Sequence, residues 1–223
     1  DVARKVADVF KSVYKTFGDQ QFACMYDAIL SGLKIHGDAM NFDVMVSELE
    51  KQDSTRAHSV LSKLRPFTDL KCFVKDETFS WETIQSANGE VFIFQLASYD
   101  RDTQILLTEF LLWDIWNYCT QFGDETKPII LVMDEAQNLS HQENSPSGKI
   151  LTEGRKFGIS GWYATQFMKP QLDDAEIQRL QQAGQKLYFC PPDEGVITVS
   201  KNIDISSNGS KEWAERLKKL KKG

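Results

Sequence analysis

The second half of the chain alternates short apolar runs with amphipathic stretches, and this alternation limits the available folds more than any other feature. From Glu90 onward the runs have the length of strands, and the stretches between them have helical spacing. Strands separated by helices form right-handed βαβ units, in which helices cover both faces of a parallel sheet. We therefore predict an α/β fold. The expected strands are 91–96, 129–133, 161–165 and 186–190, and the expected helices are 102–121, 148–157 and 173–183.

The N-terminal part of the chain is predicted to be helical. Apolar residues at helical spacing indicate two helices within 1–33 and a third over 41–64, which Pro66 is expected to end. Residues 65–89 mix turn-forming residues with short apolar pieces, which predicts loops around short strands. The expected domains are a helical region, 1–66, and an α/β region, 67–223.

The composition describes a folded chain without a general affinity for polyanions. Of its 223 residues 41% are apolar, which is enough for a substantial core. Acidic residues outnumber basic ones, 32 to 26, so the surface as a whole does not favour nucleic acid or anionic lipid. The end of the chain, 211–223, is an exception because six of these residues are basic. A solvated helix face is the simplest interpretation of that segment.

Cysteine usage and hydropathy predict a soluble cytoplasmic protein without a membrane partner. The four cysteines are scattered, with no Cys-x-x-Cys pair and no histidine nearby at metal-ligand spacing. Neither a zinc site nor a disulfide framework is therefore indicated. No apolar run approaches the roughly 20 residues that a membrane-spanning helix needs.

Two adjacent acids, Asp134 and Glu135, follow the expected strand 129–133 in the stretch PIILVMDEAQN. Ligands of open α/β sheets bind at the carboxyl ends of strands, where these acids lie. An aspartate there can hold Mg²⁺, and a neighbouring glutamate can orient and deprotonate an attacking water. The alternative is structural, because an acidic pair also suits the N-terminus of a helix.

Three further polar residues follow in the stretch EGRKFGISGWYATQ. Gln166 ends the next expected strand, so its amide lies beside the acids if the two strands are neighbours, although a plain loop residue remains an alternative. Arg155 lies at the end of the intervening helix, where a cation ordinarily complements the helix dipole. Its alternative role is an arginine finger that reaches a phosphate bound to a neighbouring subunit. Lys156 is a weaker candidate for the same nucleotide.

Together, IILVMDEAQNLS and EGRKFGISGWYATQ resemble the C-terminal half of the motor domain in the HerA/FtsK superfamily of RecA-like ATPases. This superfamily includes HerA-type DNA translocases and conjugation-type secretion ATPases. The resemblance covers about residues 90–223 well and 1–64 loosely. The stretch Asp-Glu-Ala-Gln also occurs in DEAD/DEAH-type RNA helicases, but the Arg-Lys-Phe-Gly run and the lack of a second RecA-like domain favour the HerA pattern.

The resemblance implies a RecA-like (P-loop NTPase) parallel sheet with flanking helices, following the N-terminal helical region. It assigns Mg²⁺ binding to Asp134, the general base to Glu135, the sensor to Gln166, the trans-acting finger to Arg155 and a weaker nucleotide contact to Lys156. ATP and Mg²⁺ are the expected cofactors. Such proteins form hexameric rings that pump double-stranded DNA through a central channel, which 141–149 is a candidate to line.

The phosphate-binding loop of such ATPases, Gly-x-x-x-x-Gly-Lys-Ser/Thr, does not occur in the sequence. The pair Gly148-Lys149 lacks both the first glycine and the hydroxyl residue, and it follows the acids instead of preceding them. In the family this loop lies well before the acidic pair, so we expect it upstream of Asp1 in a longer protein. The chain by itself is then expected to hydrolyse ATP poorly.

Two functional hypotheses remain at this point. The first is part of a HerA-like motor that translocates or unwinds DNA in bacterial DNA processing or phage defence, such as phosphorothioation-dependent restriction, with nuclease or restriction proteins as partners. The second is a non-catalytic assembly or partner-binding module of the same fold. The presence of Asp134, Glu135, Arg155 and Gln166 together favours the motor, because no structural role requires all four.

Overall fold

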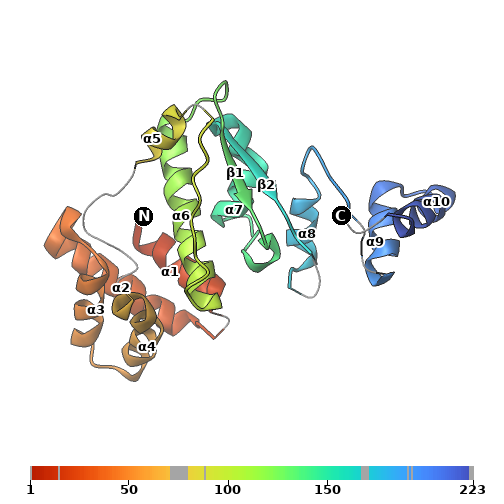
Figure 1. Ribbon diagram of the computed structural model, residues 1–223. Helices are drawn as coiled ribbons and strands as arrows, with labels where there is room; N and C mark the ends of the chain where they lie inside the picture. Colours follow the sequence, from red (N-terminus) through yellow and green to blue (C-terminus); the bar gives the residue numbers. More distant parts are fainter. Residues whose placement is uncertain are drawn as a thin grey trace. The chain divides into compact units, whose positions relative to one another are not determined.

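The computed structural model describes residues 2–14, 16–70, 80–87, 89–166, 171–189, 191 and 193–220 (Figure 1). The chain divides into two compact units, 1–182 and 183–223. The smaller unit holds two helices in contact with each other, α9 (Asp193–Ile203) and α10 (Ser207–Lys218). The division expected at residue 66 stays a prediction.

The larger unit begins with helices, as predicted. The two helices expected within 1–33 are confirmed as α1 (Val2–Val13) and α2 (Asp19–His36), with the short 3-10 turn η1 (Gly37–Ala39) after them. The single helix expected over 41–64 is wrong, because this segment forms α3 (Phe42–Lys51) and α4 (Thr55–Asp69).

The break between α3 and α4 has a local cause. Asp53 has a positive φ of 39°, which ends the helix, and the Ser54 hydroxyl then caps the next one by accepting a hydrogen bond from the Ala57 N–H at 3.1 Å. Pro66 does not end α4, which continues to Asp69. Its pyrrolidine ring removes one backbone donor from the helix, and the next residue, Phe67, is buried.

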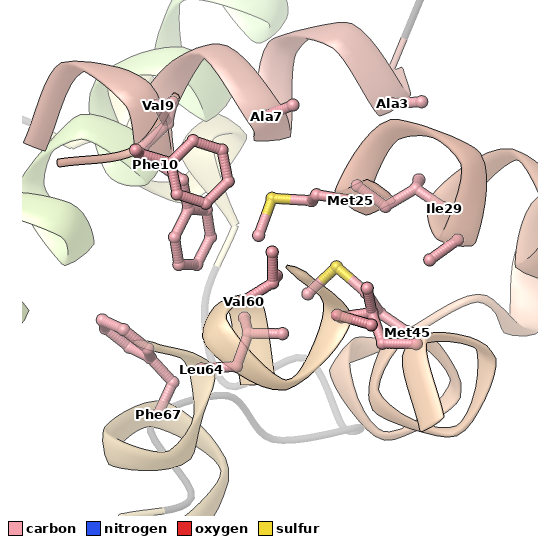
Figure 2. Packing of buried hydrophobic residues seen from close by; sticks show 14 of the residues in the cluster. Ala3, Ala7, Val9, Phe10, Met25, Ile29, Met45, Val60, Leu64 and Phe67 are labelled. Carbon is pink, nitrogen blue, oxygen red and sulfur yellow. The ribbon is translucent and has the colours of Figure 1, made fainter. Parts of the chain in front are cut away.

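The core of α1 to α4 is formed by apolar side chains that meet between the helices (Figure 2). Phe10, Met25 and Leu64 are completely buried. The ring of Phe10 also contacts Phe110 of the long helix α6 (Arg101–Phe122), with ring centroids 6.2 Å apart. This core therefore extends to α6, and the strands of the larger unit pack against the same helix.

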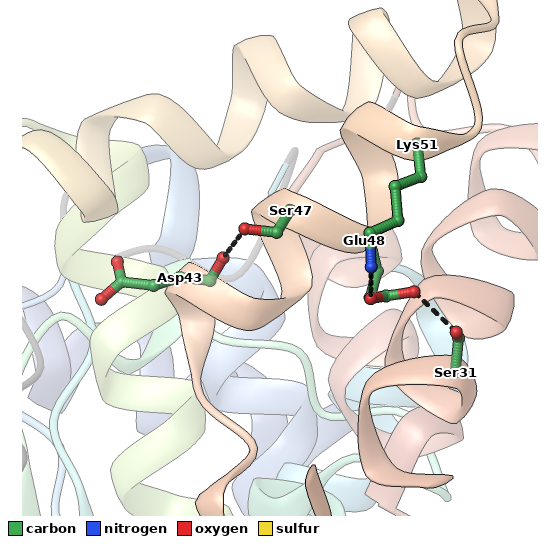
Figure 3. Close-up of polar contacts among 5 residues, drawn as sticks. All are labelled: Ser31, Asp43, Ser47, Glu48 and Lys51. Atoms are coloured by element: carbon green, nitrogen blue, oxygen red, sulfur yellow. Dashed lines mark hydrogen bonds and ion pairs between the residues drawn. The ribbon is translucent and has the colours of Figure 1, made fainter. Parts of the chain in front are cut away.

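The carboxylate of Glu48 is largely covered by its neighbours and links two helices of this region (Figure 3). The Glu48 side chain on α3 is only 6% exposed and accepts hydrogen bonds from the Ser31 hydroxyl at 2.6 Å and from the Lys51 ammonium. These two hydrogen bonds, that of Lys51 first, hold the pKa of Glu48 below its usual range. The ionised carboxylate thus joins α2 to α3.

Replacing Glu48 with glutamine is expected to lower stability at neutral pH and to have little effect in acid. A carboxyl whose pKa is lowered by folding stabilises the fold above the unfolded-state pKa of 4.5, and this contribution is lost as pH falls through the lower folded-state value. Urea unfolding of wild type and Glu48→Gln at pH 7 and pH 3 measures the difference. Glu50→Gln, an exposed change on the same helix, is the control. An equal loss of stability in Glu48→Gln at both pH values would contradict the prediction.

The two strands lie beside α6. β1 (Ile129–Met133) and β2 (Ile159–Tyr163) pair in parallel, with Ile129 opposite Ile159, and the chain crosses between them through α7 (Pro146–Glu153) and the 3-10 turn η3 (Gly154–Phe157). One face packs against α6 and α7. The strands contribute Ile129, Met133 and Ile159 to this buried contact. The helices contribute Trp116 of α6 and Ile150 of α7.

The opposite face of this sheet is apolar and exposed. Alternate residues of a strand point to opposite faces, and Ile130 and Val132 share theirs with Trp162, the parallel partner of Val132. These three side chains are 57%, 70% and 60% exposed, respectively. The described helices of the larger unit therefore cover one face of the sheet and not both.

The predicted fold class is wrong. The described residues are mainly helical, and their only sheet is β1–β2, so a RecA-like parallel sheet is not present among them. The expected strand 91–96 has no strand pairing, and Val91 and Ile93 are 83% and 76% exposed. The described part of the expected strand 186–190 does not form a strand either. Both segments have the apolar composition of strands, but a strand exists only where a neighbour completes its hydrogen bonds.

The remaining expectations for the larger unit are mostly confirmed. Helix 102–121 corresponds to α6, helix 148–157 to α7 with η3, and helix 173–183 to the shorter α8 (Asp174–Leu180). The expected strand 161–165 begins two residues earlier, as β2. The loops around short strands expected within 65–89 are wrong for its described residues, which form no strand but the end of α4 and a short helix, α5 (Trp81–Ser86); residues 71–79 and 88 lie outside the described part.

The register of β2 depends on one glycine. Gly158 has a φ of 67°, and a Cβ there would lie 2.5 Å from the Asp124 carbonyl oxygen. Its carbonyl accepts the Ile129 N–H at 2.9 Å, which aligns the starts of both strands. Only glycine satisfies the backbone conformation and the close contact together. No helix in the described part of the chain has the length and apolar character to cross a membrane.

Candidate functional site

The ends of β1 and β2 bring the acids and the predicted sensor together. The parallel pairing extends past the strands, since the Ala164 N–H donates to Met133 O and the Ala136 N–H donates to Ala164 O, both at 2.9 Å. Gln166 consequently reaches the turn after β1, and its Nε2 donates to Oε1 of Glu135 at 2.6 Å. The sequence-based expectation that this amide lies beside the acids is met, and its role as a sensor stays a prediction.

The backbone at Glu135 is unusual. Its φ of 52° and ψ of 38° place it in the left-handed region, which non-glycine residues rarely occupy. The Asp134 carboxylate supports this turn because its Oδ1 accepts the Glu135 N–H at 2.9 Å. Such conformations cost free energy and are concentrated at functional sites. Asp134 itself is exposed, whereas Glu135 is half-buried.

Gln137 is a site residue that sequence reasoning missed. It lies in the 3-10 turn η2 (Ala136–Asn138), is only 8% exposed, and donates a hydrogen bond from Nε2 to Oε2 of Glu135. The available signal was its position two residues after the glutamate in DEAQN. That spacing brings the side chains together only because the chain turns tightly at Glu135.

A buried histidine is hydrogen-bonded to the turn after β1. His141 is fully buried, with Nε2 2.7 Å from Ala136 O and Nδ1 2.7 Å from the Ser147 hydroxyl. A carbonyl oxygen can only accept, so Nε2 carries the proton and Nδ1 accepts from Ser147. Burial lowers the pKa of His141, which favours this neutral form. The turn is thereby joined to α7.

Two more helices hold the loop that follows. Oε1 of Glu176 on α8 accepts the His141 N–H at 2.9 Å, and Arg179 donates to the His141 carbonyl. From α6, Oε1 of the buried Glu109 accepts the Ser140 N–H at 2.9 Å. The start of the loop after η2 is therefore hydrogen-bonded to α6 and α8.

Arg155 and Lys156 lie at the other end of the strands. Both belong to η3, directly before β2, whereas Glu135 and Gln166 follow the strands. A strand of five residues spans about 16 Å at roughly 3.3 Å per residue. Both cations are exposed, and the Lys156 ammonium lies 5.2 Å from the centre of the Phe157 ring. The fold does not bring them to the carboxylates of the same chain.

Lys149, in the segment proposed to line a DNA channel, packs on aromatic rings. Its ammonium lies 5.1 Å from the centre of the Trp113 ring and 6.0 Å from that of Trp116, both on α6. These cation–π contacts give the half-buried lysine a structural role.

The turn after β1 offers carboxylate oxygens as possible metal ligands. Among the described residues, no three His, Cys, Asp or Glu side chains are grouped to hold a metal ion. Magnesium needs no such cage, because it is usually bound by one or two carboxylates together with waters and substrate phosphates. The exposed carboxylate of Asp134 is a suitable oxygen ligand of this kind.

Comparison with known proteins adds no family assignment. No protein-family model matches the chain, and no curated protein matches it significantly. The resemblance to HerA/FtsK-type ATPases therefore rests on the residues quoted above.

Proposed function

We propose that the turn after β1 is the part of an ATP-hydrolysing site that activates water. The protein would use the free energy of ATP hydrolysis to move along double-stranded DNA. The observation that carries this proposal is the Glu135 carboxylate, half-buried at a strand end and held by the Gln166 amide at 2.6 Å. A general base must be fixed within hydrogen-bond reach of the water that it deprotonates, and this arrangement fixes it.

The two acids have separate tasks in this proposal. Asp134 would hold Mg²⁺, which neutralises negative charge on the phosphate oxygens when it is bound. Glu135 accepts the proton of the attacking water. Gln166 orients the glutamate and, in this proposal, would also sense the terminal phosphate. The left-handed backbone at Glu135 supports this division because it turns the second acid away from the direction of the first.

Other parts of the site must come from elsewhere. The 223 residues contain no Gly-x-x-x-x-Gly-Lys-Ser/Thr loop, so another part of a longer polypeptide or another subunit would hold the triphosphate. Arg155 lies at the far end of the strands and is exposed. Its distance from Glu135 of the same chain supports the proposal that it acts on a nucleotide of a neighbouring subunit, as in a ring-shaped assembly.

A protein that joins this chain to a phosphate loop is expected to hydrolyse ATP, faster with double-stranded DNA and not at all when Mg²⁺ is removed. Phosphate release, measured with and without DNA and with Mg²⁺ or excess EDTA, tests this. The 223-residue chain alone is the control, for which little hydrolysis is expected. Metal-independent turnover would contradict the role of Asp134, and a lack of turnover under all conditions would contradict the proposed function.

One observation favours the second hypothesis, a non-catalytic assembly module. The exposed sheet face of Ile130, Val132 and Trp162 is an apolar surface of the kind that marks protein contacts. Such a module does not need the amide contact to Glu135. A substitution of this glutamate that keeps the fold separates the two hypotheses.

A further inference from the structure

The two oxygens of the Glu135 carboxylate are each hydrogen-bonded to a glutamine amide. Oε1 accepts from Gln166, which follows β2, and Oε2 accepts from Gln137, which lies in η2. One hydrogen bond leaves a carboxylate free to rotate about its last torsion angle. Donors on both oxygens restrict this rotation and fix the plane of the group.

The orientation of the Gln137 amide follows from chemistry. An ionised carboxylate only accepts hydrogen bonds, so the Nε2 of Gln137 must face Glu135, and its Oε1 must point away. Among the described residues this Oε1 is the one buried side-chain polar atom without a hydrogen-bond partner. A buried acceptor that is left unpaired destabilises the folded state. Buried polar atoms are nearly always paired, so this exception needs an explanation.

The backbone on both sides of Gln137 is held in place. His141 Nε2 donates to the carbonyl of Ala136 at 2.7 Å, and Arg101 of α6 donates to Oδ1 of Asn138 at 2.5 Å. The amide of Gln137 therefore projects from a short turn anchored at its two ends. A donor on a fixed turn can orient a carboxylate with little loss of entropy.

We propose that Gln137 is a positioning residue that, with Gln166, holds the Glu135 carboxylate in the orientation needed to accept a proton from water. The unpaired Oε1 is the energetic cost of directing Nε2 at Glu135. The inference deepens the proposed function and rests on it for its effect on turnover. The contact itself is testable in the 223-residue chain without any activity.

The first measurement is the side-chain amide spectrum of the ¹⁵N-labelled 223-residue chain. Glu135→Ala is expected to shift the carboxamide resonances of both Gln137 and Gln166 and to speed exchange of their protons with water. The resonances are identified by their loss in Gln137→Met and Gln166→Met. The amide of Gln142, exposed in the following loop, is the control and should not respond. A response of Gln166 without one of Gln137 would overturn the proposal.

The second measurement is turnover by the protein that joins the chain to a phosphate loop. Gln137→Met keeps the length of the side chain but cannot donate, and a misplaced catalytic group costs about 10²-fold in rate. We expect kcat to fall by about that factor while KM for ATP stays unchanged. Gln20→Met, an exposed change on α2, should leave both constants unaltered, whereas an unchanged kcat in Gln137→Met would refute the positioning role.

The two measurements separate the inference from the proposed function. If wild type does not hydrolyse ATP but both amides respond to Glu135→Ala, the proposed function fails and the double amide contact is confirmed. If wild type hydrolyses ATP and the Gln137 amide does not respond, the proposed function stands and the role of Gln137 is refuted. The spectrum of Glu135→Ala needs no Gln137 variant once the resonances are assigned, so a poorly folded Gln137→Met does not prevent the decision.

Discussion

Replacement of Glu135 with glutamine is expected to reduce ATP hydrolysis by about 10²–10⁴-fold, which is the usual contribution of a general base. Glutamine has the same shape but cannot take a proton from water at neutral pH. Asp134 remains in place to hold Mg²⁺, so nucleotide binding should survive. In the turn, the new amide keeps one acceptor oxygen but presents donors to the second neighbouring amide, Gln137 or Gln166.

The measurement compares phosphate release with binding of a fluorescent ATP analogue, for wild type and Glu135→Gln, in the protein that contains the phosphate loop. Glu143→Gln is the matched control, because Glu143 is an exposed acid in the following loop. Equal turnover in wild type and Glu135→Gln would show that the acidic pair is structural. The assembly-module hypothesis would then be preferred.

The second large effect is expected from Glu109→Gln, which should stabilise the protein at pH 8 and have little effect near pH 4. Burial, more than the nearby charge of Glu176, raises the pKa of Glu109 to about 7, although the Ser140 N–H opposes the shift. Between the ordinary value of 4.5 and about 7, the folded state binds more protons than the unfolded state. Stability therefore falls as pH rises through this range.

Above pH 7 the cost of ionising the buried carboxyl is constant and amounts to about 3 kcal/mol. A glutamine avoids this cost, and its amide oxygen can still accept the Ser140 N–H that Glu109 accepts at 2.9 Å. Urea unfolding at pH 4, 6 and 8 should show that the free energy of unfolding of the variant increases relative to that of wild type as pH rises. Glu143→Gln again serves as the exposed control. A difference independent of pH would refute the assignment.

Part of the candidate site was predictable because its residues lie at the ends of adjacent strands. The apolar run 129–133 predicted a strand with at least one buried face, and the segment that became β2 was the nearest strand along the chain. Parallel pairing then placed Gln166 beside Glu135. Gln137 was not predictable, because its contact depends on the left-handed backbone of Glu135, and sequence periodicity contains no information on such a turn.

The prediction of the fold class was wrong where strand pairing had to be inferred from composition. The segment 91–96 has the residues of a buried strand, yet Val91 and Ile93 are exposed and no strand pairs with them. In the same way, apolar periodicity across 41–64 did not reveal the break at Asp53, because a change of φ at one residue leaves the spacing of its neighbours nearly unaltered.

The sequence by itself determined several local elements, namely α1 and α2, α6, the strand before the acids and the order of the polar residues. These follow from the spacing of apolar side chains and from capping residues, which act over a few positions. Only the tertiary structure decided which segments pair as strands, which carboxyls are buried and which two amides hold Glu135. Those properties depend on contacts between residues far apart in the chain, and their free energies exist only when the partners meet.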